Sequence, residues 1–164
     1  MNQSPFTVAD LEQQERELVL EAFTNEDAWH IGSSIVERAI AEKLPVAVDV
    51  RRPDCQLFRA ALTGTTSDQG EWLERKSATT FRFEASSLLV GLRMTAADHD
   101  PFVSGWLDSA RYTLAGGSFP VRVTGAGMVA AITVSGLSSE EDHTLIVGAL
   151  RDYRARPGRG TEGA

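Results

Sequence analysis

The chain has 164 residues, which predicts a single domain large enough for a hydrophobic core. Its 23 acidic and 16 basic side chains give a formal net charge of −7, which argues against a general nucleic-acid-binding or anionic-membrane surface because both need a basic field. The single cysteine, Cys55, excludes an internal disulfide and a cysteine zinc site, and it fits a reducing compartment.

The N-terminal stretch MNQSPFTVADLEQQERE is polar and acidic. A secretory signal needs a basic start and an apolar core, and no apolar run approaches the roughly 18 residues of a membrane helix. We therefore expect a cytoplasmic protein that contacts no membrane. Residues 1–17 are expected to form an arm or a short helix over Val8–Glu17, ahead of one domain over residues 18–153.

A strand and a long helix are expected next. Leu18–Phe23, LVLEAF, fits either the end of the first helix or an edge strand, and we expect the strand. Thr24 has N-cap chemistry with Asp27 at the third position, worth about 1 kcal/mol, and it predicts a helix from Asn25 to about Lys43. One face of this helix is apolar and is expected to be buried: Ala28, Gly32, Ile35, Val36, Ala39 and Ile40.

A β-hairpin follows this helix. Pro45 ends the helix, and residues 46–51 alternate valines with Ala47, Asp49 and Arg51. The turn Arg52-Pro53-Asp54 has a physical cause, because proline presets the first turn torsion and aspartate tolerates the second. The return strand is expected over Cys55–Leu62.

The middle of the chain is predicted to hold one helix and one irregular segment. Thr63–Gln69 reads as a polar loop, and Glu71–Phe83 as a helix anchored by Trp72 and Leu73. The state of residues 88–90 stays open. Residues 95–117 show no regular pattern but contain several large apolar side chains, so we expect them to fold over the sheet or against a neighbouring subunit.

A second hairpin and a helix end the ordered part. Phe119–Thr124 and Met128–Ser135 are separated by a glycine-rich turn, and the second strand is apolar or small on both faces, as in a central strand. Ser138 lies three residues before Glu141, which is capping-box spacing, and an apolar stripe follows. Residues 154–164 form a polar, glycine-rich tail that is expected to be disordered.

Charged residues of the first hairpin and the middle helix give the main candidate site. They could form a pocket that binds a carboxylate or phosphate, or they could be ion pairs across the hairpin, which is the simpler interpretation. The residues concerned are Arg75 and Lys76 on the helix and Asp49, Arg51, Arg52 and Arg59 on the hairpin. Cys55 is either a reactive thiol near these arginines or a small buried side chain.

Each of the three histidines has a structural and a functional interpretation. His143 lies in the first turn of the last helix, where it could contact an anion, although three neighbouring carboxylates oppose one and packing is simpler. His30 fits packing or a subunit contact. His99, in Asp98-His99-Asp100, lies in a loop whose spacing does not indicate a metal site. No nucleophile elbow, phosphate loop or paired-histidine zinc helix occurs, so no catalytic residue is assigned.

Several short stretches between about Leu18 and Leu150 form a combined pattern: Gly116-Gly117, Phe119-Pro120, Val129-Ala130-Ala131-Ile132, Val134-Ser135-Gly136, Asp142 with Ala149-Leu150, and Arg75-Lys76-Ser77-Ala78-Thr79 with Phe81. This pattern resembles the haem-degrading-domain (GlcG/HbpS-like) proteins. Other stretches are similar to the cytoplasmic UPF-type branch of that family: residues 23–29, 48–52 and 140–143.

The resemblance implies an α/β (α+β), profilin-like fold in which helices flank a five-stranded antiparallel sheet, in a protein that forms homo-oligomers. Our first hypothesis is a non-catalytic module that binds a small molecule or a protein partner between the sheet, the middle helix and the irregular segment. Its candidate contacts are His143, Arg75, Lys76, Asp49, Arg51, Gly116 and Gly117. The second hypothesis, implied by the resemblance, is a haem-binding or haem-degrading protein with His30, His99 or His143 as ligand.

Overall fold

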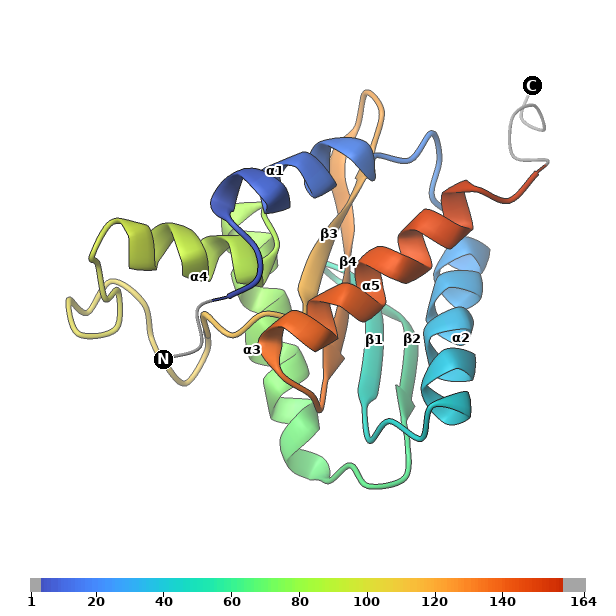
Figure 1. Ribbon diagram of the computed structural model, residues 1–164, viewed down its shortest axis with the longest axis horizontal. Coiled ribbons are helices and arrows are strands. Elements are labelled where there is room, and N and C mark those ends of the chain that lie inside the picture. Colours follow the sequence, from blue (N-terminus) through green and yellow to red (C-terminus); the bar gives the residue numbers. More distant parts are fainter. Residues whose placement is uncertain (1–3, 158–164) are drawn as a thin grey trace.

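The structure is a computed structural model that describes residues 4–157 (Figure 1). Its helices and strands follow the expected order of two hairpins separated by helices. The helices are α1 (Val8–Glu17), α2 (Asn25–Ala41), α3 (Ser67–Phe83), α4 (Ser87–Ala96) and α5 (Ser139–Arg154). The strands are β1 (Ala47–Arg52), β2 (Cys55–Ala61), β3 (Ser118–Val123) and β4 (Gly127–Ser135).

The strands form one antiparallel sheet in the order β2-β1-β4-β3. The sheet has four strands within residues 4–157, so the expectation of five was wrong. The missing strand is Leu18–Phe23, which makes only a single parallel bridge, between Leu20 and Val123. Leu18 and Leu20 are buried by packing, and the chain then enters α2 before a ladder can extend.

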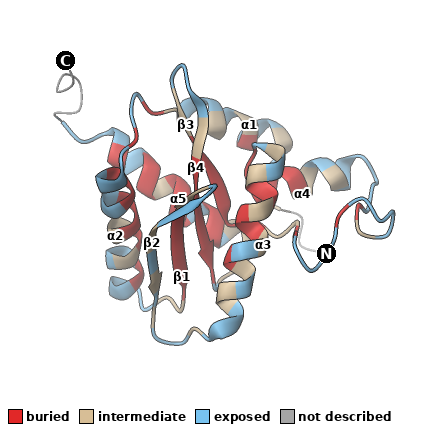
Figure 2. Cartoon of the chain, turned by 180° about the vertical axis from the view of Figure 1, so that it is seen from behind, coloured by how far each residue is buried: buried red, intermediate tan, exposed pale blue. Residues whose placement is uncertain are grey.

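Helices cover the two faces of the sheet unequally. Helices α2 and α5 lie on one face and α3 on the other (Figure 1). Seen from behind, α3 lies to one side, and β1 and β2 remain in view without a helix over them (Figure 2). The apolar core lies between the sheet and the α2–α5 layer, where Val48, Ile132 and Ile146 are fully buried. Strand β4 is central and its second half is buried, as its composition predicted.

The predicted starts of α2 and α5 are confirmed. Thr24 with Asp27 and Ser138 with Glu141 form reciprocal capping boxes at α2 and α5. The buried face of α2 was predicted less well, because the Ile40 side chain is 61% exposed and Ile31 is fully buried instead. Successive helical residues differ by about 100°, so Ile40 points away from the sheet that its neighbour Ala39 contacts.

The middle of the chain is more helical than expected. Thr66 caps α3, which therefore begins at Ser67 inside the expected loop. Residues 88–90 belong to α4, which packs against α1 through Leu11 and Leu89. Residues 97–117 are irregular, as predicted. The expected disordered tail lies mostly outside the described residues, because α5 runs to Arg154 and the description stops at residue 157.

Candidate functional site

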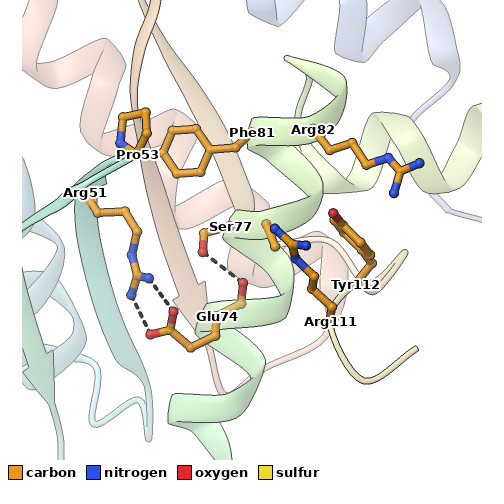
Figure 3. A pocket seen from close by; sticks show the side chains of 9 residues that line it. Arg51, Pro53, Glu74, Ser77, Phe81, Arg82, Arg111 and Tyr112 are labelled. Carbon is orange, nitrogen blue, oxygen red and sulfur yellow. Dashed lines mark hydrogen bonds and ion pairs between the residues drawn. The ribbon is translucent and has the colours of Figure 1, made fainter. Parts of the chain in front are cut away.

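A cleft with a volume of about 530 Å³ lies across α3, between the end of β1 and the irregular segment (Figure 3). Arg51, Pro53 and Phe81 lie on one side of the helix in this view, and Arg82, Arg111 and Tyr112 on the other. Between them the surface of α3 carries Ser77 and Ala78, whose small side chains leave the hollow open. The remaining lining residue is Glu74.

A buried carboxylate organises the β1 side of the cleft. Asp49 has no solvent exposure and accepts hydrogen bonds from Arg51 Nε (2.5 Å), Arg51 Nη2 (3.0 Å) and Gln56 Nε2 (2.7 Å). Arg51 in turn bonds both carboxylate oxygens of Glu74, and Arg59 Nη1 lies 3.2 Å from one of them. The simpler sequence interpretation, ion pairing across the hairpin, therefore holds for Asp49, Arg51 and Arg59.

These ion pairs shift the pKa values of two members. Burial acts to lower the pKa of Arg51, but its hydrogen bonds to Glu74 and Asp49 outweigh that effect and raise it. The hydrogen bond from Arg51 lowers the pKa of Glu74. Both side chains are therefore charged at neutral pH. Sequence reasoning missed Glu74, because its pairing with Arg51 spans 23 positions and depends on how α3 crosses the sheet.

A β-bulge places the hairpin side chains on one face. Gln56 and Arg59 are three residues apart, and in a regular strand their side chains would point to opposite faces. The register between β1 and β2 shifts after Val50, so that Leu57 is an extra residue in β2. Gln56 and Arg59 consequently both reach Asp49.

Two arginines and an aromatic ring form the other side of the cleft. The guanidinium of Arg82 lies 5.0 Å from the ring centre of Tyr112, and that of Arg111 lies 5.3 Å from the same ring. Arg82 is also 5.7 Å from the ring of Trp106. Within residues 4–157, neither Arg82 nor Arg111 forms an ion pair. This side of the cleft therefore carries two positive charges that no acidic side chain of the described range neutralises by direct pairing.

A buried hydrogen-bond pair holds the irregular segment against α3. Thr79 Oγ1 donates to the backbone oxygen of Thr113 (2.7 Å) and lies 3.2 Å from the Thr113 backbone nitrogen, which donates to it. Both threonines are buried. This contact fixes Tyr112, the preceding residue, beside the helix.

Lys76 and the two glycines lie outside this cleft. Lys76 Nζ is buried and donates to Asp142 Oδ2 (2.8 Å) and to the Val134 oxygen (3.0 Å). A side chain at Gly117 would come within 2.8 Å of this nitrogen, and Gly116 bonds Ser139. Burial lowers the pKa of Lys76 and raises that of Asp142, while each charge partly offsets the shift of the other. The pair joins α3 to α5.

Lys76 also borders a smaller hollow of about 230 Å³ together with Trp72. Arg75 stacks on Trp72, with 4.0 Å from guanidinium carbon to ring centre, and it does not line the cleft across α3. Arg52 points to the opposite side and donates to the Phe23 oxygen (3.3 Å). Cys55 is exposed at the start of β2.

The three histidines lie on separate elements. His143 is fully buried between the rings of Phe6 and Phe119, its Nε2 is 2.8 Å from Gln14 Oε1, and burial lowers its pKa to about 4. His30 is exposed on α2, and His99 is exposed beside Trp106. Of these three candidate haem ligands, His30 and His99 are therefore open to solvent and His143 is enclosed by the protein.

No group of three or more His, Cys, Asp or Glu side chains within residues 4–157 lies close enough to hold a metal ion. No helix of the same range is sufficiently long and apolar to cross a membrane.

Relatives of known sequence match most of the chain. Residues 23–151 match a family model described as haem degrading protein HbpS-like. A UPF0303 protein of Streptomyces coelicolor is 48% identical over 147 residues, which cover 90% of this chain and 93% of that protein. A UPF0303 protein of Mesorhizobium japonicum is 41% identical over 153 residues, 93% of this chain and 92% of that protein.

Solved structures share the fold. The crystal structure of the Ybr137w protein has a TM-score of 0.84 and 30% identity, over 92% of this chain and 90% of that one. The HbpS crystal structure has a TM-score of 0.65 and 24% identity, covering 82% and 91% of the two chains. The crystal structure of a PduOC:heme complex has a TM-score of 0.67 and 17% identity, covering 79% and 94%.

Proposed function

The chain belongs to the HbpS-like haem degrading protein family, in the branch of the UPF0303 proteins, and from this premise we propose a non-catalytic, cytoplasmic binding protein. Its ligand is a small molecule with a carboxylate or phosphate and a flat apolar part, held in the cleft across α3. The observation that carries the proposal is the pair of guanidinium groups, Arg82 and Arg111, beside Tyr112 without an ion-pair partner within residues 4–157.

A guanidinium group near an aromatic ring keeps N–H donors available to an acid. The ring attracts the cation and limits its motion, while the donors on the planar fork match the two oxygens of a carboxylate or phosphate. Phe81 and Pro53 offer apolar surface at the far end of the cleft. The site therefore suits a ligand with one acidic end and one flat apolar end.

The polar groups of the cleft support binding rather than chemistry. The hydroxyl of Ser77 donates to the backbone oxygen of Glu74 (3.0 Å), so it is not paired with a base. Arg51 and Glu74 are charged and paired with one another. Nucleophilic catalysis needs a nucleophile within hydrogen-bond reach of a base, and the lining residues supply no such pair.

Benzoate is a suitable probe because it has one carboxylate and one flat ring. In isothermal titration calorimetry we expect Arg82→Ala and Arg111→Ala each to weaken benzoate binding by about tenfold, the scale of one charge-assisted hydrogen bond. Arg75→Ala is the matched control, because it removes the same charge from α3 outside the cleft. Unchanged benzoate binding in both cleft variants would contradict the proposal.

Haem is the second candidate ligand. The family model describes haem degrading proteins, and the PduOC structure is a complex with heme. The exposed side chains of His30 and His99 are the candidates for a single axial ligand, because His143 is buried and hydrogen-bonded to Gln14. A haem titration followed by absorbance tests this candidate: a Soret shift that disappears when the exposed pair, His30 and His99, is replaced would establish it. No Soret shift in the wild type would remove it.

We further propose that the protein forms homo-oligomers through the side of the molecule that carries α2. Trp29 and Ile40, both on α2, have 62% and 61% of their surfaces exposed, which is unusual for side chains of this size. Light scattering is expected to show an assembly that Trp29→Ser with Ile40→Ser weakens. A strict monomer at all working concentrations would contradict it.

A further inference from the structure

We infer that Glu74 occupies an anion-binding subsite formed by Arg51 and Arg59, and that a ligand with two acidic groups displaces it. The inference rests on the proposed function, because the first acid of such a ligand binds at Arg82 and Arg111. It extends that function by naming the ligand class, a small dianion that lies across α3 with one acid at each end.

The subsite is held in place without Glu74. The fully buried carboxylate of Asp49 accepts two hydrogen bonds from Arg51, at 2.5 and 3.0 Å, and lies 3.8 Å from Arg59 Nη1. Gln56 supplies Asp49 with a further hydrogen bond from the same face of the sheet. The guanidinium of Arg51 therefore keeps its orientation when its other partner leaves.

Glu74 has the properties of a replaceable partner. Its side chain is 52% exposed, whereas that of Asp49 is fully buried. Within residues 4–157 the carboxylate of Glu74 contacts only Arg51 and Arg59, and the hydrogen bond from Arg51 lowers its pKa. It is a carboxylate anion on a flexible side chain, so a ligand carboxylate can replace it with the same bonds.

The balance of charges favours a ligand acid that displaces Glu74 over one that binds beside it. With Glu74 in place, two acids, Asp49 and Glu74, neutralise two arginines, Arg51 and Arg59. A second ligand acid would then meet a carboxylate already in the subsite. With Glu74 withdrawn, one positive charge remains unneutralised and faces the cleft.

Space is available for the withdrawn side chain. Glu74 also borders a second hollow of about 650 Å³ on the Arg59 side of α3, where Thr66 and Gly70 lie. The side chain thus stands between two hollows, and rotation toward the second one, which Arg59 also lines, releases Arg51 to the ligand in the first.

Terephthalate and benzoate test the inference, because they share a flat ring and differ by one carboxylate. In calorimetric titrations we expect Glu74→Gln to tighten terephthalate binding by about tenfold more than benzoate binding, because only terephthalate carries a second carboxylate that competes with Glu74. Glu71→Gln is the matched control: Glu71 is exposed one turn earlier on α3 and makes no ion pair within residues 4–157. It should leave both affinities within about twofold.

The outcomes separate the inference from the proposed function. Equal terephthalate affinity in wild type, Glu74→Gln and Glu74→Ala, with benzoate binding still weakened in Arg82→Ala, overturns the inference and leaves the proposed function standing. Equal gains in Glu74→Gln and Glu71→Gln also overturn it, because they show a general charge effect. Absence of binding of either probe to every folded variant, as judged by circular dichroism, overturns both.

Discussion

The buried Lys76–Asp142 pair and the half-exposed cluster of Glu74 with Arg51 and Arg59 begin two residues apart on the same helix. Two helical positions differ by about 200°, so Lys76 points inward and Glu74 outward. The side chain of Lys76 is 5% exposed and that of Glu74 is 52% exposed. Both make short ion pairs, yet only one is open to replacement by a ligand.

The difference shows that burial, more than distance, decides what an ion pair does. A charge that loses its partner in the interior has no water to replace it, whereas an exposed charge is solvated at once. The inward pair therefore joins α3 to α5 and β4, and the outward cluster can exchange partners. Four predictions follow this contrast, from the largest effect to the smallest.

Removal of the buried cation should have the largest effect. Lys76→Ala leaves Asp142 buried without a counter-charge, and we expect the free energy of unfolding to fall by about 3–5 kcal/mol. Urea denaturation measures the loss. Replacing both partners by apolar residues, Lys76→Met with Asp142→Leu, should recover most of it. A loss below about 1 kcal/mol in Lys76→Ala would mean that the two environments do not differ as argued.

His143, next to Asp142 in sequence, shows how burial changes the pKa of a side chain that forms no ion pair within residues 4–157. Its folded pKa of about 4 is lower than its ordinary value of 6.5, so only the unfolded chain takes up the proton between these values. The free energy of unfolding is therefore unaffected by protonation of His143 above about pH 6.5. It falls as the pH falls from 6.5 toward 4, by about 3 kcal/mol in total.

Denaturation at several pH values checks this prediction. The slope of the unfolding free energy against pH reports how many more protons the unfolded chain binds. His143→Gln should lower this number by about one between pH 4 and 6.5, while His30→Gln, on the exposed surface of α2, should leave it unchanged. Equal slopes in the wild type and His143→Gln would show that the buried histidine is not responsible.

Thr79 tests a buried polar contact that carries no charge. Thr79→Val removes the hydrogen bond to the Thr113 oxygen and should destabilise the fold by about 1–2 kcal/mol, less than the loss of a buried charge. It should also weaken benzoate binding, since Tyr112 loses its anchor. Thr95→Val is the control, because Thr95 is exposed and bonds only within its own helix. The same stability loss in both variants would count against a special role for the Thr79 contact.

Glu74→Gln should change stability least. Exposed ion pairs contribute about 0–1 kcal/mol, and Arg51 keeps its bonds to Asp49. Thermal denaturation should place the variant within about 1 kcal/mol of the wild type. A loss as large as that of Lys76→Ala would show that Glu74 is structural, and the exchange inferred for it would then be untenable.

The sequence predicted the elements whose signals are local. Capping boxes at Thr24 and Ser138, the Pro53 turn and the apolar composition of β4 depend on neighbours within a few positions, and the structure confirms them. The prediction of a strand over Leu18–Phe23 was wrong because an apolar composition also suits a connecting segment whose leucines are buried in the core. Whether it pairs depends on a distant strand that local patterns do not describe.

The sequence predicted where the cleft lies but not which residues line it. The expected position between the sheet, α3 and the irregular segment agrees with the hollow that the structure contains. Arg111 was missed, and its position beside Arg82 was not predicted, because nothing local brings residues 82 and 111 together. Lys76 was grouped with the hairpin arginines because it follows Arg75, although the helical period turns it toward α5.

The β-bulge at Leu57 makes this cleft sensitive to chain length. Asp49, Gln56 and Arg59 meet only because β2 contains one residue more than the opposing stretch of β1. A conservative substitution in the hairpin leaves the number of residues in β2 unchanged. Deletion of one residue from β2 would reverse which of its side chains face α3. Relatives that differ from this chain at many hairpin positions can therefore keep the Asp49 cluster, provided that their hairpins have the same number of residues.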